Sequence, residues 1–173
     1  ALLSSALRQP DPCMRSLVQL FSTDPVLTAR MLALANEPAH QLGQRVHSIP
    51  EALVVLAPVQ LRQLLNKSAP TGATHALTGW SLASFWRYSL DTARIARALA
   101  MSVQANASAA YTLGLLHGLG QLLLHTADPE TFVRLAEMLD PIHPKRPRIE
   151  IKLMGCCSAQ ITAHLARQWN FPL

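Results

Sequence analysis

His117 is the residue of this sequence whose type and setting best suit chemistry. It lies in an apolar run, Tyr111–Leu124, where Gly114, Gly118 and Gly120 are three of the 7 glycines in the chain. An imidazole in such a run can bind a metal ion, contact a ligand, or hydrogen-bond to the backbone around it. Glycines clustered in an apolar run predict close helix packing followed by a turn. We therefore expect this run to lie at the structural centre of the fold.

Ligands that could join His117 at a metal site are scarce. Between residues 52 and 127 the sequence has one carboxylate, Asp91, and it lies among arginines. Hard divalent cations prefer carboxylate oxygens, and zinc needs three or four converging ligands. The adjacent Cys156 and Cys157 would point about 100° apart on a helix, so only one of them could join His117. We therefore expect no metal, no cofactor and no catalytic residue.

Arginines on the predicted helix at about 80–104 offer a second kind of chemistry. Arg87, Asp91, Arg94 and Arg97 are three or four residues apart and share one side of that helix. If they face inward, Arg87 and Arg94 could hold a phosphate together with His117. If they face outward, they form surface ion pairs with Asp91, which is the interpretation we favour.

The elements that position these residues are expected to be helices of one domain. Of the 173 residues, 50% are hydrophobic and 14% are charged, and Leu and Ala dominate. No apolar run reaches the roughly 18 residues that span a membrane. Three cysteines without metal-ligand spacing fit free thiols in a reducing cytoplasm. The sequence begins with Ala1 instead of Met, and we expect it to be part of a longer protein.

Start signals divide the chain into about eight to ten helices in two lobes. Asp-Pro pairs at 11–12, 24–25 and 128–129 can each cap a helix, and Ser48 with Glu51 forms a capping box. In the long helix we expect Ile95 and Leu99 to be buried. A Pro- and Gly-containing stretch at 68–79 predicts a linker between an N-terminal lobe (about 1–67) and a C-terminal lobe (about 80–173). The sequence predicts helices ending near Pro10 and at about 12–21, 25–36, 48–56, 59–66, 80–104, 107–117, 121–125, 129–139, from 148, and 158–169.

Nucleic-acid binding is an alternative that the net charge of +5 and the pI of about 9.6 permit. The helix pair at 48–66 resembles a helix-turn-helix and would present Arg62 and Lys67. The remaining basic residues are dispersed, except for Lys145, Arg146 and Arg148, which we interpret as a solvated loop. Because a footprint normally gathers charge on one face, we favour a structural role for the helix pair.

Five segments in order resemble the HDOD domain, an HD-related output domain of bacterial signalling proteins. Asp24–Asn36 is similar to its "DP-x-L-x-x-x-L-L-x-x-A-N" helix, and Ser48–Ala57 to "S-I-x-x-A-I-x-x-L-G". Phe85–Ser89 is similar to "F-W-x-x-S", and Gly114–Gly120 to "G-L-L-H-D-I-G". Gly155–Pro172 is similar to the closing "G-x-x-H-A-x-x-G-x-x-L-x-x-x-W-x-L-P". The resemblance covers nearly the full chain.

The resemblance implies an irregular all-α bundle of HD-like type used as a regulatory module. HD phosphohydrolases hold a metal with histidines and aspartates, including a His-Asp pair, and the metal activates water. Here the pair reads His117-Gly118, and Tyr88 and Ser158 replace two histidines often found in the family. The resemblance therefore implies a non-catalytic module, with these residues and the two arginines at most lining a relic pocket.

Three functions remain open at this point. The first, which we favour, is a cytoplasmic signalling module that contacts other signalling proteins or domains of the same polypeptide. Relatives of the family are commonly fused to receiver or cyclic-dinucleotide turnover domains. The second is a degenerate pocket that binds or weakly hydrolyses a nucleotide or cyclic dinucleotide, and the third is a DNA-binding regulator. The sequence does not indicate an oligomeric state.

Overall fold

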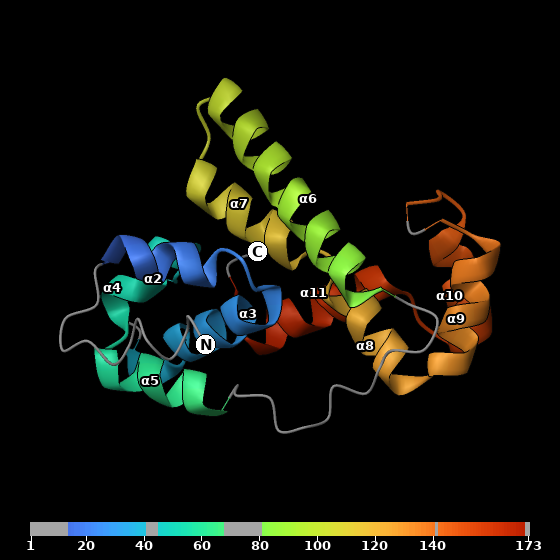
Figure 1. Ribbon diagram of the computed structural model, residues 1–173, viewed down its shortest axis with the longest axis horizontal. Helices are drawn as coiled ribbons and strands as arrows, with labels where there is room; N and C mark the ends of the chain where they lie inside the picture. Colours follow the sequence, from blue (N-terminus) through green and yellow to red (C-terminus); the bar gives the residue numbers. More distant parts are fainter. Residues whose placement is uncertain (1–13, 41–44, 68–80, 141, 172–173) are drawn as a thin grey trace.

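The computed structural model of the chain describes residues 14–40, 45–67, 81–140 and 142–171, and every regular element in these ranges is a helix. The prediction of an all-α fold is therefore confirmed (Figure 1). None of the described helices is long and apolar enough to cross a membrane. The predicted helix ending near Pro10, the Asp-Pro pair at 11–12 and the predicted linker at 68–79 lie outside the described residues.

The first described part of the chain is a group of short helices, and capping side chains set the starts of α3 and α4. They are α2 (Met14–Phe21), α3 (Pro25–Ala35), the 3-10 helix η1 (Pro38–His40), α4 (Ile49–Val55) and α5 (Pro58–Lys67). Asp24 accepts hydrogen bonds from two backbone N–H groups of α3 at 2.9 Å each. Ser48 accepts one from the Glu51 N–H at 3.5 Å, and the Glu51 carboxylate accepts from the Ser48 hydroxyl and the His47 N–H at 2.7 Å each. Both predicted helix starts are confirmed.

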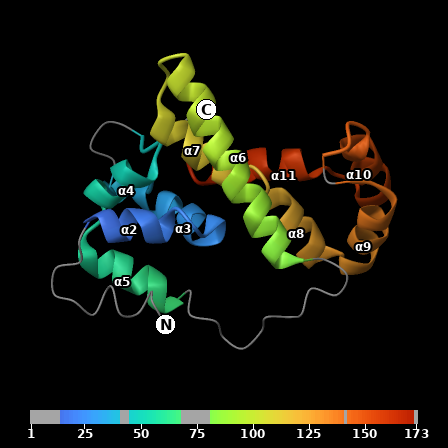
Figure 2. The ribbon, with the colours of Figure 1, turned by 45° about the horizontal axis from the view of Figure 1, so that its top comes forward.

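A long helical hairpin follows, formed by α6 (Leu82–Ser102) and α7 (Ala107–Leu116). The two helices pack backbone to backbone, because a Cβ added to Gly114 would lie 2.8 Å from the Cα of Ala93. The other side of α7 contacts α3 and α4, and the free end of the hairpin projects from the rest of the molecule (Figures 1 and 2). The expected burial of Ile95 and Leu99 is wrong: they are 61% and 63% exposed. This outer face of α6 lies away from α7.

The remaining helices are α8 (Leu119–Ala127), α9 (Pro129–Met138), α10 (Arg146–Met154) and α11 (Ser158–Gln168). Asp128 caps α9 as predicted, accepting a hydrogen bond from the Thr131 N–H at 3.1 Å. Gly155 ends α10 in the left-handed conformation, with φ of 79°, where a glycine carries the least strain. Helix α8 packs against both α9 and α11. The first and last helices of this part of the chain are therefore in contact.

The main hydrophobic core joins the short N-terminal helices to the α7–α8 junction. It contains side chains of α2 to α5 together with Leu115, Leu116 and Leu119 from the apolar run, and Phe171 near the end of the described chain. Leu115 is fully buried, but Leu113 and Leu123 of the same run are 58% and 41% exposed, so the run lies in the core only in part. The division into two lobes and the status of residues 1–173 as one domain stay predictions.

Candidate functional site

His117 lies at the end of α7, where its ring is held from two directions. The Nδ1 atom is 2.6 Å from the carbonyl oxygen of Gly114. Because a carbonyl only accepts, Nδ1 is the donor in this contact. Nε2 is buried and has no hydrogen-bond partner in the described part of the chain. The Tyr88 ring lies edge-on to the imidazole, with the ring centroids 5.0 Å apart.

Gly118, the next residue, is enclosed by α6. A Cβ added there would lie 2.9 Å from Cε2 of Phe85 and 3.7 Å from the Oγ of Ser89. Ser89 is fully buried, and its hydroxyl has no hydrogen-bond partner among the described residues. A side chain larger than hydrogen at 118 would therefore have to displace the Phe85 ring.

Thr162 of α11 forms hydrogen bonds to the α7–α8 junction. Its Oγ1 accepts a hydrogen bond from the Gly120 N–H at 2.9 Å. The same hydroxyl lies 3.1 Å from the Ser158 carbonyl oxygen and 3.2 Å from that of His117, so its proton can be donated to either. Gly120 allows this approach because a Cβ at that position would lie 1.9 Å from the Ser158 carbonyl oxygen. The α7–α8 junction and the start of α11 are thus in direct backbone contact.

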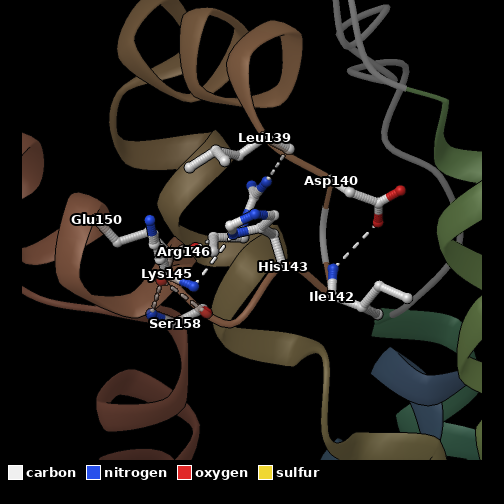
Figure 3. Close-up of polar contacts among 8 residues, drawn as sticks. All are labelled: Leu139, Asp140, Ile142, His143, Lys145, Arg146, Glu150 and Ser158. Atoms are coloured by element: carbon white, nitrogen blue, oxygen red, sulfur yellow. Dashed lines mark hydrogen bonds and ion pairs between the residues drawn. The ribbon is translucent and has the colours of Figure 1, made fainter.

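The side chain of Ser158 is hydrogen-bonded to the carboxylate of the buried Arg146–Glu150 ion pair (Figure 3). Its Oγ and its backbone N–H donate to Oε2 of Glu150 at 2.9 Å and 2.7 Å. The other oxygen of Glu150 accepts from Nε of Arg146 at 2.9 Å, and Arg146 also donates to the Leu139 carbonyl oxygen at 2.9 Å. The guanidinium carbon lies 5.4 Å from the centre of the Phe132 ring. This network joins α9, α10 and the N-terminus of α11.

The interpretation of Arg146 as a solvated loop residue is wrong. It is the first residue of α10 and is 2% exposed, because Glu150 neutralises its charge one turn later in the same helix. The i, i+4 spacing of Arg146 and Glu150 was the available signal, but that spacing is equally common in exposed pairs. Glu150 and Thr162 were not identified from the sequence, since Glu150 also bonds Ser158 of the next helix and Thr162 bonds Gly120 of α8.

The two arginines named as pocket candidates are exposed on α6. Arg94 pairs with Asp91 at 3.2 Å, with 70% of its side chain exposed, which is the surface pairing the sequence predicts. Arg87 is also exposed. The structure therefore brings together Tyr88, His117 and Gly118 and connects Ser158 to them through Thr162, while the charged side chains of α6 lie in solvent.

A small cavity of about 60 Å³ lies beside His117. Its walls are mainly apolar and include Leu113, Leu165, Trp169 and Phe171. In the described part of the chain, no three or more His, Cys, Asp or Glu side chains are grouped so that they could hold a metal ion. His125, eight residues after His117, is buried against the ring of Phe132 with centroids 5.1 Å apart.

Comparison with known proteins extends the similarity over the whole chain. The sequence model of the HDOD domain family matches residues 2–173. An uncharacterized protein of Treponema pallidum (strain Nichols) is 29% identical over 174 residues, which is 98% of this chain and 33% of that protein. The chain therefore spans about a third of this relative.

Two solved structures resemble the fold. The MmoQ response regulator of Methylococcus capsulatus str. Bath superposes with a TM-score of 0.83 at 28% identity, covering 99% of this chain and 68% of the other. A protein of Shewanella amazonensis SB2B, provisionally assigned as a phosphohydrolase, superposes with a TM-score of 0.50 at 33% identity, covering 99% of this chain and 61% of the other.

Proposed function

The chain belongs to the HDOD domain family, and from that premise we propose that it is a non-catalytic regulatory module of bacterial signal transduction. It acts through contacts with other signalling proteins or with neighbouring domains of the same polypeptide in the cytoplasm. Receiver and cyclic-dinucleotide turnover domains are the partners that the family resemblance favours. The description of MmoQ as a response regulator supports a place for this fold in signalling.

The observation that carries the proposal is the environment of Gly118. An HD phosphohydrolase needs an aspartate directly after the pair's histidine, because the carboxylate is the harder ligand for the metal. Here a glycine follows His117, and the Phe85 ring occupies the space that a side chain would need, 2.9 Å from the position of a Cβ. The Phe85 ring of α6 therefore lies over the position where the resemblance expects an aspartate side chain.

Two further positions support the same conclusion. Tyr88 contributes a ring edge to His117 and has no metal-binding nitrogen. The Ser158 hydroxyl is already used by Glu150. A metal ion at His117 would meet the lone pair of one imidazole and mainly apolar walls, which is too few ligands for Mg²⁺, Mn²⁺ or Zn²⁺.

A small-ligand site at His117 is the second candidate, because its buried Nε2 has no hydrogen-bond partner in the described residues. The adjacent cavity of about 60 Å³ is far smaller than the roughly 300–1,000 Å³ that ligand pockets usually offer. A nucleotide could enter only if helices moved apart. Titration calorimetry with nucleotides and cyclic dinucleotides, with His117→Ala and Arg94→Ala as controls, tests this candidate, and heat lost in both variants would support it.

The proposed function is tested by a hydrolysis assay and a binding assay. The chain is incubated with Mn²⁺ or Mg²⁺ and with bis(p-nitrophenyl) phosphate or a cyclic dinucleotide, and we expect no turnover. We also expect Gly118→Asp alone to stay inactive and to bind no Mn²⁺, because Tyr88 has no metal-binding nitrogen and the Ser158 hydroxyl is already bonded to Glu150, so His117 and one carboxylate are too few ligands. Turnover that disappears in His117→Ala would overturn the proposal. Binding to an isolated receiver domain or cyclic-dinucleotide turnover domain, measured by calorimetry, is the expected positive result.

A further inference from the structure

The side of α10 that faces away from the protein is basic. Lys145, Arg148 and Lys152 are exposed, whereas the single acidic residue of this helix, Glu150, is fully buried. The backbone of Lys145, the N-cap, is already in the right-handed helical region. At about 100° per residue, the three cations therefore fall within an arc of about 60° on the side opposite Arg146 and Glu150. We call Lys145, Arg148 and Lys152 the basic ridge.

The charge of the basic ridge is not neutralised within the described chain. Arg146, on the buried side of the same helix, is paired with Glu150. No carboxylate of the described residues lies within ion-pair distance of Lys145, Arg148 or Lys152. The ridge therefore keeps all of its positive charge and presents it to solvent.

These cations are placed where they oppose formation of the helix. Lys145 and Arg148 lie at the start of α10, where the first turn has no acidic residue and the N-cap makes no side-chain hydrogen bond. The N-terminus of a helix carries a partial positive charge, and like charges three or four residues apart repel each other. A glutamate at position 148 would therefore stabilise α10 better than arginine does. An arrangement that works against its own helix indicates a role other than folding.

We propose that the basic ridge is a docking surface for an acidic helix of a partner protein. Its cations are three and four residues apart and extend over about 10 Å. A partner helix that lies along α10, with carboxylates at the same spacing, meets all three of them. Ile151 is 44% exposed and lies about 60° from Arg148, so it offers an apolar contact beside the charges. The inference rests on the proposed function, because it names the surface through which the module contacts a partner.

Three other occupants fit the basic ridge less well. A second copy of this chain, related by a twofold axis, would bring two basic ridges together. A DNA duplex would gain only three phosphate contacts from the ridge, and affinity for DNA depends on the number of such contacts. A helix that lies on a membrane inserts an apolar face into the lipid, but the side of α10 opposite the ridge is packed against α9 and α11.

The buried network behind the ridge holds α10 in place and connects it to the α7–α8 junction (Figure 3). Glu150 binds Arg146 on one side and the backbone N–H and hydroxyl of Ser158 on the other. Thr162, whose hydroxyl lies 3.1 Å from the Ser158 carbonyl oxygen, in turn accepts from the Gly120 N–H of α8. A partner on the ridge therefore binds a pre-organised helix that is linked by hydrogen bonds to the centre of the fold.

The test uses two stapled helical peptides as probes, each with one leucine and with either glutamates or lysines three and four residues apart. Fluorescence anisotropy measures their binding to the wild-type chain at about 50 mM and about 300 mM salt. We expect the glutamate peptide to bind, and to bind more weakly at the higher salt. We expect the lysine peptide not to bind.

Charge reversal on the ridge is compared with the same change of charge elsewhere. Lys145→Glu/Arg148→Glu should weaken the glutamate peptide by about tenfold or more and allow the lysine peptide to bind. Arg87→Glu/Arg97→Glu, at exposed residues of α6, changes the net charge equally and should leave binding of the glutamate peptide within about twofold. Because the ridge variant places carboxylates at the N-terminus of α10, its Tm should equal or exceed that of wild type.

Several results would overturn the docking surface. They are equal binding of both peptides, binding of neither, an equal loss in the α6 variant, and a ridge variant with a clearly lower Tm. Dimerisation, binding of a DNA duplex, or binding to phosphatidylserine vesicles that the ridge variant abolishes would assign the ridge to another occupant and overturn it as well. None of these results changes the hydrolysis assay, so failure of this inference can be distinguished from failure of the proposed function.

Discussion

Replacing the glycines of the Tyr111–Leu124 run by alanine should change the free energy of unfolding by three different amounts. Each glycine meets a different neighbour. A Cβ at Gly120 would lie 1.9 Å from a carbonyl oxygen of α11, at Gly114 it would lie 2.8 Å from a Cα of α6, and at Gly118 it would lie 2.9 Å from the edge of the Phe85 ring. Backbone atoms can move only with their helix, whereas a ring can rotate.

The magnitudes follow from opposing contributions. Alanine in a helix interior is about 1 kcal/mol more favourable than glycine. Overpacking costs about 1–3 kcal/mol, and a buried N–H without a partner costs about 1–3 kcal/mol more. At Gly120 both costs apply, because separating α8 from α11 also breaks its bond to Thr162, and we expect a net loss of about 3 kcal/mol. At Gly114 we expect a loss of about 1 kcal/mol. Gly118 is the N-cap of α8 and not a helix-interior residue, so alanine gains nothing from helix propensity there. Because the ring can move, we expect a loss of about 0.5 kcal/mol.

Urea unfolding followed by circular dichroism measures these changes, provided that the m-values agree. Gly155→Ala is the control for backbone conformation, since Gly155 has φ of 79° and no atom within 4 Å of an added Cβ. It should lose about 1 kcal/mol from backbone strain alone. A Gly120→Ala variant as stable as wild type, or a Gly118→Ala variant that is the least stable of the series, would refute the packing argument.

Three further predictions concern polar groups. Glu150→Ala should lower the free energy of unfolding in urea by about 3–5 kcal/mol, because Arg146 stays buried without its carboxylate partner. The double variant Glu150→Leu/Arg146→Met should recover most of this loss. A loss below about 1 kcal/mol in the single variant would contradict the prediction. Hydrogen bonds from Thr131 lower the pKa of Asp128 below 3.8, so Asp128 stabilises the fold above that pH. The Tm deficit of Asp128→Ala should shrink as pH falls through the lowered pKa, and a constant deficit would contradict it. Burial raises the pKa of Tyr111 above 10.0, so wild type should lose more stability than Tyr111→Phe as pH rises above 10; parallel pH curves would argue against it.

Helix starts could be predicted from the sequence because they depend on neighbouring residues. Asp24, Ser48 and Asp128 each cap the helix that their spacing to proline or glutamate indicates. Burial of the apolar run was predictable only in part, because Leu115 is buried whereas Leu113 and Leu123 are exposed. These features involve contacts within a few residues, where spacing alone specifies geometry.

Features that depend on which helices meet could not be predicted. Ile95 and Leu99 have the same apolar character as buried residues of α6, and their exposure follows from where α7 packs. Arg146 is buried because Glu150, the Leu139 carbonyl and the Phe132 ring surround it. No spacing rule places α9 beside α10. In each case the tertiary arrangement decides whether a given side chain faces solvent.

The glycines that make the α7–α8 junction compact also limit what it can do. Gly114 brings α6 against α7, Gly120 brings α11 against α8, and Gly118 admits the Phe85 ring. A junction packed on three sides by helices has no volume for a substrate, and the cavity beside His117 of about 60 Å³ reflects this. Under the proposed function, we expect a signal to reach this junction through helix contacts instead of a bound substrate. The α6 hairpin is well placed to transmit such a signal, because one of its faces is packed on the junction and another is exposed to solvent.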